Sequence, residues 1–191
     1  MNRIMVIGIS AGVGKSTFAR NLAEILYIPV YHLDAFYWKP GWVEASIEEF
    51  STAQQDIVNQ HQWIIEGNYS NTFEIRAEHA DTIIYLELPL YICLYRVIKR
   101  WLTNIGKTRP DMGAGCKEKI DWDFIKFICT TYYPRKRKMA ERLQFFQSLG
   151  SKKVIITLKS KQEINSYLEN IKKQEEIARV DFSNLNKNNP F

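Results

Sequence analysis

The chain has few cysteines, and their arrangement builds neither a disulfide framework nor a metal site. Cys93, Cys116 and Cys129 are odd in number and form neither a CxxC pair nor a spacing typical of zinc ligands. In a chain of 191 residues this favours reduced thiols and a cytoplasmic setting.

Long apolar runs are also missing. The apolar stretch at the N-terminus is short and is soon followed by Lys15, which argues against a signal peptide. The most apolar later run, residues 82–95, is interrupted by Glu87 and Pro89 and falls short of the roughly 20 residues that cross a bilayer. We therefore expect no membrane insertion.

The chain also lacks an even distribution of positive charge. The net charge is +5, yet residues 96–153 hold 15 Lys/Arg against 5 Asp/Glu, whereas the rest of the chain holds 11 against 16. Basic residues gathered in one segment indicate an anion bound there and argue against a nucleic-acid coat over the whole surface.

What is present is an alternation of short apolar runs with stretches of helical spacing. The apolar runs predict strands at residues 3–7, 29–33, 63–65, 82–86 and 154–158. Helical spacing and capping signals predict helices at residues 18–26, 46–60, 90–101, 122–150 and 161–173. This alternation predicts an α/β fold, a three-layer sandwich with a five-stranded parallel sheet and helices on both faces.

The length favours a single domain, which we place at residues 1–173. Residues 103–121 contain three glycines and one proline without steady periodicity, and we interpret them as a lid within the basic helical region. Residues 174–191 end in an asparagine-rich stretch and are expected to form a C-terminal tail.

The segment Gly8–Thr17 lies between the first predicted strand and the first predicted helix, which is the setting of a P-loop. Its glycines let successive N–H groups point at phosphate oxygens. Lys15 is expected to reach the β and γ phosphates of ATP, and the Ser16 hydroxyl to bind Mg²⁺. The residues expected to hold ATP are Gly12, Val13, Gly14, Lys15, Ser16 and Thr17. The alternative is an ordinary glycine-rich turn with an exposed lysine.

The start of this loop departs from the usual pattern. Counted back from Gly14, the pattern G-x-x-x-x-G-K-[ST] places Ile9 where a glycine is expected, and Gly8 comes one residue early. The sequence therefore predicts an altered start to an otherwise intact loop.

Carboxylates follow the second and third predicted strands. Ligands of open parallel sheets bind beyond the carboxyl ends of the strands. We predict that Asp34 orients or deprotonates the phosphate acceptor, or assists Mg²⁺ through water. Glu66, followed by Gly67 and Asn68, is predicted to contact the acceptor or a metal-bound water. The alternative is that both acids are turn or cap residues.

Arginines flank the predicted lid. Arg96 and Arg100 are four residues apart and share one helix face, where two guanidiniums can grip phosphate oxygens during transfer. The alternative for this pair is a solvated helix face. Arg109 is predicted to contact the substrate, with an ion pair to Asp111 as its alternative.

A second rank of cations lies on the helix that returns from the lid. Arg135 and Arg137 are predicted to contact the nucleotide, although at least two members of the run 135–138 are expected to face water. The aromatic residues after the second strand either stack on a planar acceptor or pack in the core: Phe36, Tyr37, Trp38 and Trp42. The histidines His32, His61 and His79 lack metal or triad spacing and are expected to be structural.

Four segments together resemble the adenylate-kinase-like group of P-loop proteins. They are Gly12-x-Gly14-Lys-Ser-Thr, Tyr31-His-Leu-Asp34, residues 63–69 and Arg96-x-x-x-Arg100. They are most similar to bacterial proteins described as DNA topology modulation proteins, over about residues 1–170. The resemblance implies that Arg96 and Arg100 stand where the lid begins and contact the transferred phosphate. The label of the family implies an influence on DNA supercoiling.

These observations favour transfer of the γ-phosphate of ATP to a small acceptor, such as a nucleoside or nucleotide, by a monomer or dimer. The acceptor stays open, because residues 34–60 lack the nucleoside-monophosphate signature of the usual kinases. The alternatives are a nucleotide-gated DNA-binding regulator and a stand-alone ATPase. No DNA-reading element is evident in the sequence.

Overall fold

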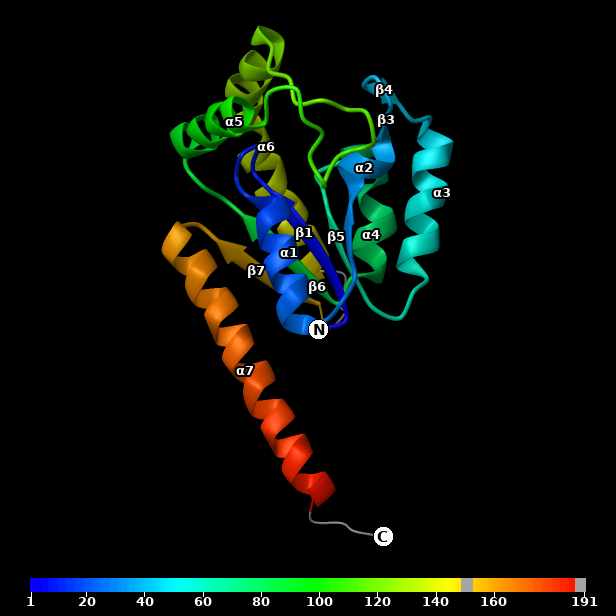
Figure 1. The fold of residues 1–191 in the computed structure, drawn as a ribbon, viewed down its shortest axis with the longest axis vertical. Coiled ribbons are helices and arrows are strands. Elements are labelled where there is room, and N and C mark those ends of the chain that lie inside the picture. The colour runs from blue at the N-terminus through cyan, green and yellow to red at the C-terminus, as the bar shows by residue number, and fades with distance from the viewer. Residues whose placement is uncertain (149–152, 188–191) are drawn as a thin grey trace.

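A five-stranded parallel sheet forms the centre of the molecule (Figure 1). The structure, a computed structural model, describes residues 1–148 and 153–187. The strands of the sheet are β1 (Arg3–Gly8), β2 (Val30–His32), β5 (Trp63–Glu66), β6 (Thr82–Leu86) and β7 (Val154–Leu158). They lie in the order β2-β5-β1-β6-β7, and every neighbouring pair is parallel. The predicted fold class and all five predicted strands are confirmed.

Helices cover both faces of the sheet. They are α1 (Lys15–Leu26), α2 (Leu33–Tyr37), α3 (Ile47–Val58), α4 (Phe73–His79), α5 (Leu90–Asn104), α6 (Trp122–Ser148) and α7 (Lys161–Lys187). Helices α1 and α7 pack together in front of the sheet in the view of Figure 1, where Phe18 stacks on Tyr167. Helix α6 lies behind the sheet and packs on α4, where Phe73 stacks on Phe146.

Three strands of the sheet are covered on both faces. Every residue of β5 and β6 is buried, and so is all of β1 after Arg3. Strands buried in this way need apolar side chains on both faces, so they appear as continuous apolar runs instead of alternating ones.

Local signals fix several helix ends. The predicted capping box begins α3: the Ser46 hydroxyl accepts from the Glu49 N–H at 3.1 Å, and the Glu49 carboxylate accepts from the Ser46 N–H at 3.0 Å. Helix α6 continues through Pro134 as far as Ser148. The predicted stop at Gly150 lies outside the described residues.

Three elements differ from the sequence prediction. Helix α7 does not end at residue 173 but continues to Lys187, because residues 174–187 contain no glycine or proline and begin with good helix formers. The tail predicted for residues 174–191 is therefore helical as far as Lys187. Helix α4 was not predicted. Residues 38–44, for which no strand was predicted, form a small antiparallel hairpin of β3 (Trp38–Lys39) and β4 (Val43–Glu44).

Of the predicted lid, residues 105–121 form a loop between α5 and α6, and residues 103 and 104 belong to the end of α5. The loop is closed on itself by bridges between Ile105 and Glu118 and between Thr108 and Lys117. It crosses the end of the sheet to the β3–β4 hairpin (Figure 1), where the Trp42 indole N–H donates to the Lys117 carbonyl at 3.0 Å. Within the described ranges no helix is both long and apolar enough to cross a membrane.

Candidate active site

The predicted P-loop joins β1 to α1 and presents an uncapped helix end. Gly12 and Gly14 have φ of 79° and 103°, in the left-handed region that strains other residues. A Cβ at Gly12 would lie 2.2 Å from the Cys93 carbonyl oxygen. No side chain caps the N-terminus of α1. Its first N–H groups are therefore available to an anion, as phosphate binding requires.

The displaced glycine at the start of the loop has a structural reason. The Asn68 side chain brackets Gly8: its Oδ1 accepts from the Gly8 N–H at 3.0 Å, and its Nδ2 donates to the Gly8 carbonyl at 2.7 Å. A Cβ at Gly8 would lie 2.5 Å from Val13 Cγ1. Ile9, in the usual place of the glycine, is buried in the core. The position that has no room for a side chain is therefore Gly8, one residue before the usual place of the glycine. The role of Asn68 as an acceptor contact stays a prediction.

Glu66, at the end of β5, lies beside the P-loop. Its Oε1 accepts from the Ser16 hydroxyl at 2.9 Å and lies 3.0 Å from His32 Nδ1. The Glu66 side chain is only 2 % exposed. His32, which we expected to be structural, therefore contacts a predicted site residue. The signal that was available is its position at a strand end, two residues before Asp34.

Asp34, on α2 immediately after β2, accepts a hydrogen bond from the Tyr69 hydroxyl at 2.7 Å. Burial, together with the nearby charge of Glu66, raises the pKa of the Asp34 carboxyl above its ordinary value. The hydrogen bond from Tyr69 and the charges of Lys15 and Arg109 oppose this rise in pKa without cancelling it. Asp34 is consequently a stronger base than a solvent-exposed aspartate.

A fully buried arginine, Arg76 of α4, supports the loop that carries Tyr69. Its guanidinium donates to the Tyr69 carbonyl at 3.2 Å, to Thr72 Oγ1 at 3.1 Å and to Gln54 Oε1. Burial lowers the pKa of Arg76 to about 9, so it remains charged at neutral pH. Sequence reasoning missed Arg76, because its partners come from α3 and from the turn before α4.

Most of the predicted site residues line a single cavity of about 1370 Å³. The predicted site residues that line it are Gly12, Val13, Gly14, Lys15, Ser16, Thr17, Asp34, Gly67, Asn68, Arg96, Arg100, Arg109 and Arg135. Glu66 reaches it through Ser16. Arg137 is exposed and lies outside the lining, whereas Lys138 and Arg142 belong to it. Positions 135, 138 and 142 share one face of a helix, and position 137 does not.

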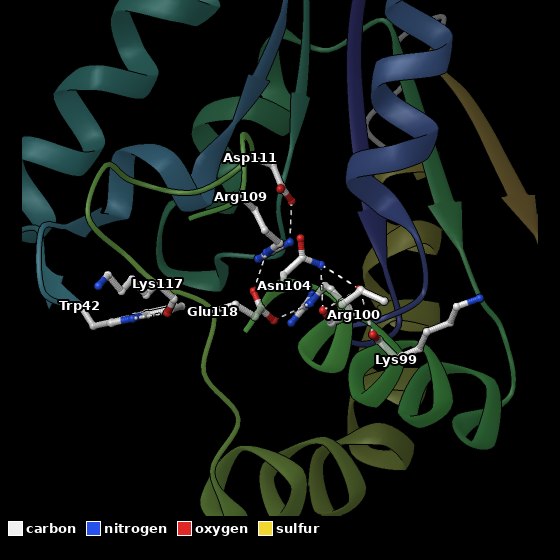
Figure 2. A network of polar contacts seen from close by, with 9 residues as sticks. Trp42, Lys99, Arg100, Asn104, Arg109, Asp111, Lys117 and Glu118 are labelled. Atoms are coloured by element: carbon white, nitrogen blue, oxygen red, sulfur yellow. Dashed lines mark hydrogen bonds and ion pairs between the residues drawn. The ribbon is translucent and has the colours of Figure 1, made fainter. Parts of the chain in front are cut away.

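The arginines of α5 and the lid form an ion-pair network over the cavity (Figure 2). The Glu118 carboxylate forms ion pairs with Arg100 Nε at 2.8 Å and with Arg109 Nε at 2.7 Å. Arg109 also donates to Asp111 at 2.8 Å, so the alternative that the sequence offered for Arg109 is formed. Arg96 instead donates to the Val13 carbonyl at 2.8 Å. Three arginines of the basic segment, Arg96, Arg100 and Arg109, therefore turn inward.

Asp111 brings the lid to the P-loop. Its burial alone would raise the pKa of the carboxyl, but the charge of Arg109 and the nearby Ser16 side chain outweigh burial and hold the pKa below its ordinary value. Asp111 is thus an anion in contact with the predicted Mg²⁺ ligand.

The aromatic residues after β2 divide between the core and the cavity, and stacking on an acceptor stays a prediction. Tyr37 packs edge-on against Phe50 at 5.1 Å and tilted against Tyr69 at 4.7 Å, as part of the core. Trp38 and Trp42, with ring centroids 5.4 Å apart, line the cavity.

The donor set suits Mg²⁺ in one respect. In the part of the chain that the structure describes, no group of three or more His, Cys, Asp or Glu side chains could hold a metal ion unaided. Mg²⁺ in phosphate-transfer sites keeps several waters and phosphate oxygens as ligands and takes only one or two from the protein. The hydroxyl of Ser16, hydrogen-bonded to Glu66, fits that requirement.

Comparisons with known proteins identify the fold. No protein-family model and no curated protein sequence matches the chain. Two shikimate kinases resemble it: that of Acinetobacter baumannii, in complex with shikimate (TM-score 0.52, 15% identity, 96% of this chain and 94% of that one), and that of Bacteroides thetaiotaomicron (0.52, 16%, 92% and 98%). So does a putative kinase from Chloroflexus aurantiacus (0.51, 14%, 91% and 98%). The similarity to DNA topology modulation proteins stays a prediction. The chain has the α/β fold of P-loop kinases, with a five-stranded parallel sheet between helices.

Proposed function

We propose that the protein transfers the γ-phosphate of ATP to a hydroxyl group of a small acceptor. One observation carries the proposal: the P-loop lysine and a partly buried aspartate of raised pKa line the same cavity, and each lies within electrostatic reach of the other. A kinase needs this pairing of a phosphate cradle with a base. The fold shared with shikimate kinases supports it.

The residues divide the work between the two substrates. The loop backbone and Lys15 hold the phosphates, and Asp34 accepts the proton of the attacking hydroxyl. Arg96 is fixed beside the loop by its bond to the Val13 carbonyl, and a Cβ at Gly14 would lie 3.1 Å from its guanidinium. A cation held there stabilises the charge that spreads over the phosphoryl group in the transition state.

Ser16, supported by Glu66, is the residue that would hold Mg²⁺, which when bound neutralises phosphate charge. The lid explains our preference for transfer over hydrolysis. Asp111 and Glu118 are buried where the lid crosses the cavity, and a closed cavity excludes water that would compete with the acceptor.

The test is Lys15→Ala, assayed as transfer and release of label from γ-labelled ATP with Mg²⁺. We expect turnover to fall at least about 100-fold, the effect of losing one group that stabilises transition-state charge. Lys172→Ala, an exposed change on α7, is the matched control, and circular dichroism checks that both variants are folded. Unchanged turnover in Lys15→Ala would refute the proposal.

A further inference from the structure

The cavity has two ends of different character. One end is the P-loop, with Lys15, Arg96 and the cations of α6 around it. The other, here called the acceptor wall, is formed by Asp34, Trp38, Trp42, Glu44, Arg109 and Lys119, which belong to α2, the β3–β4 hairpin and the lid. The composition of this wall bears on which compounds it admits.

The arginine of the acceptor wall is already neutralised. The Arg109 side chain is 13% exposed, and it is bonded to Asp111 through one nitrogen and to Glu118 through another, at 2.8 and 2.7 Å (Figure 2). Both carboxylates are more deeply buried than Arg109 itself, at 6% and 3% exposure. An acceptor phosphate or carboxylate that took Arg109 would leave the buried Asp111 unpaired and Glu118 with Arg100 alone, and an unpaired buried anion is costly.

The second cation, Lys119, is held over an aromatic ring. Its ammonium lies 5.1 Å from the centre of the Trp42 ring, and its side chain is exposed. Glu44, which is exposed, lines the same wall, and its carboxylate near the Tyr37 hydroxyl raises the pKa of Tyr37. Asp34 adds a further negative charge. Two acids line the wall, Asp34 and Glu44, and two lie behind it, Asp111 and Glu118. Together they are at least as many as the cations of the wall.

From this charge balance and the two tryptophans we infer that the acceptor is a hydroxyl compound with no anionic group, either uncharged or carrying an amine. This inference rests on the proposed function. Aromatic faces attract neutral rings and ammonium groups, and the carboxylates of the wall accept hydrogen bonds from hydroxyl or ammonium groups. A nucleoside monophosphate or a sugar acid would bring a second anion toward Asp34 and Glu44.

The experiment uses γ-labelled ATP, Mg²⁺ and acceptors matched in their rings but different in charge. The sets are adenosine with adenosine monophosphate, shikimate methyl ester with shikimate, and glucosamine and glucose with glucuronate. We expect label on an uncharged or amine-bearing member, with kcat/KM at least about tenfold above its anionic partner, as for one like-charge contact at a partly exposed site.

A charge-reversal variant tests the cause. Glu44→Lys is expected to raise kcat/KM for the anionic members at least about threefold relative to their partners, with the KM for ATP unchanged. Glu24→Lys, an exposed change on α1, is the matched control and is expected to leave this ratio alone.

The outcomes separate the two proposals. Label that goes by preference to anionic members overturns the inference, and so does ATP hydrolysis that depends on Lys15 while no uncharged or amine-bearing member is labelled. In either case the phosphate end of the site still stands. Turnover that survives Lys15→Ala refutes the proposed function itself.

Discussion

The lid is seated on the hairpin through a contact too close for any side chain. A Cβ at Gly113 would lie 1.8 Å from the Trp38 carbonyl oxygen and 3.0 Å from its carbon. Gly113 does not have a positive φ, so alanine fits the backbone conformation itself. Gly113→Ala therefore tests the docking of the lid without adding backbone strain.

The size of the effect follows from the contacts. Ordinary contacts begin near 3.4 Å, so the two backbones must separate by about 1.5 Å. This shift stretches two neighbouring hydrogen bonds of the lid, from Trp42 Nε1 to the Lys117 carbonyl at 3.0 Å and from Cys116 Sγ to the Lys39 carbonyl at 3.2 Å. Overpacking and the lost hydrogen bonds together favour the open lid by about 2–4 kcal/mol.

The assay is limited trypsin digestion followed by mass spectrometry, because Lys117 and Lys119 lie in the lid. In Gly113→Ala we expect cleavage after these lysines to be at least about tenfold faster than in the wild type, with the rest of the domain intact. The share of ATP hydrolysed instead of transferred should also rise.

The control is Gly106→Ala in the same loop. Nothing lies within 4 Å of a Cβ at Gly106, but its φ of 72° costs about 1–2 kcal/mol for alanine. Gly106→Ala therefore carries strain without a clash against the hairpin. Equal protease resistance of the wild type and Gly113→Ala would show that this contact does not hold the lid.

Two further predictions concern the support of Asp34. Tyr69→Phe removes a hydrogen bond that lowers the pKa of Asp34. The acidic limb of the pH–rate profile is set by deprotonation of this base, so it should move to higher pH. An unmoved limb would mean that Asp34 is not the base. Arg76→Met leaves Gln54 and the Tyr69 carbonyl without their buried donor, and thermal melting should show a loss of about 2–4 kcal/mol in the free energy of unfolding. The exposed change Arg137→Met should cost under about 0.5 kcal/mol, and equal losses in the two variants would contradict the support that we assign to Arg76.

The parts of the molecule that the sequence predicts well are those coded by neighbouring residues. The five strands, the capping box at Ser46 and the glycines of the P-loop each depend on a few adjacent positions. The convergence of Asp34 and Glu66 was also predictable, because carboxyl ends of parallel strands meet at one edge of the sheet.

Contacts between distant segments were beyond the sequence. Glu118 is one acid among several after α5, and only the folded lid shows that it joins Arg100 to Arg109. The pairing of Asn68 with Gly8 spans 60 residues, and periodicity carries no trace of it. The length of α7 was missed for another reason, since the asparagines near its end outweighed the helix formers before them.

The three residues after β5 differ in what fixes each of them. Gly67 has a φ of 145°, and a Cβ there would lie 2.8 Å from Leu33. Asn68 holds the backbone of Gly8, and Tyr69 holds the carboxylate of Asp34. One tripeptide thus contacts the P-loop with one residue and Asp34 with the next. A substitution that shifts the backbone of this tripeptide would therefore move Gly8 and Asp34 together, even though the two lie at the ends of different strands.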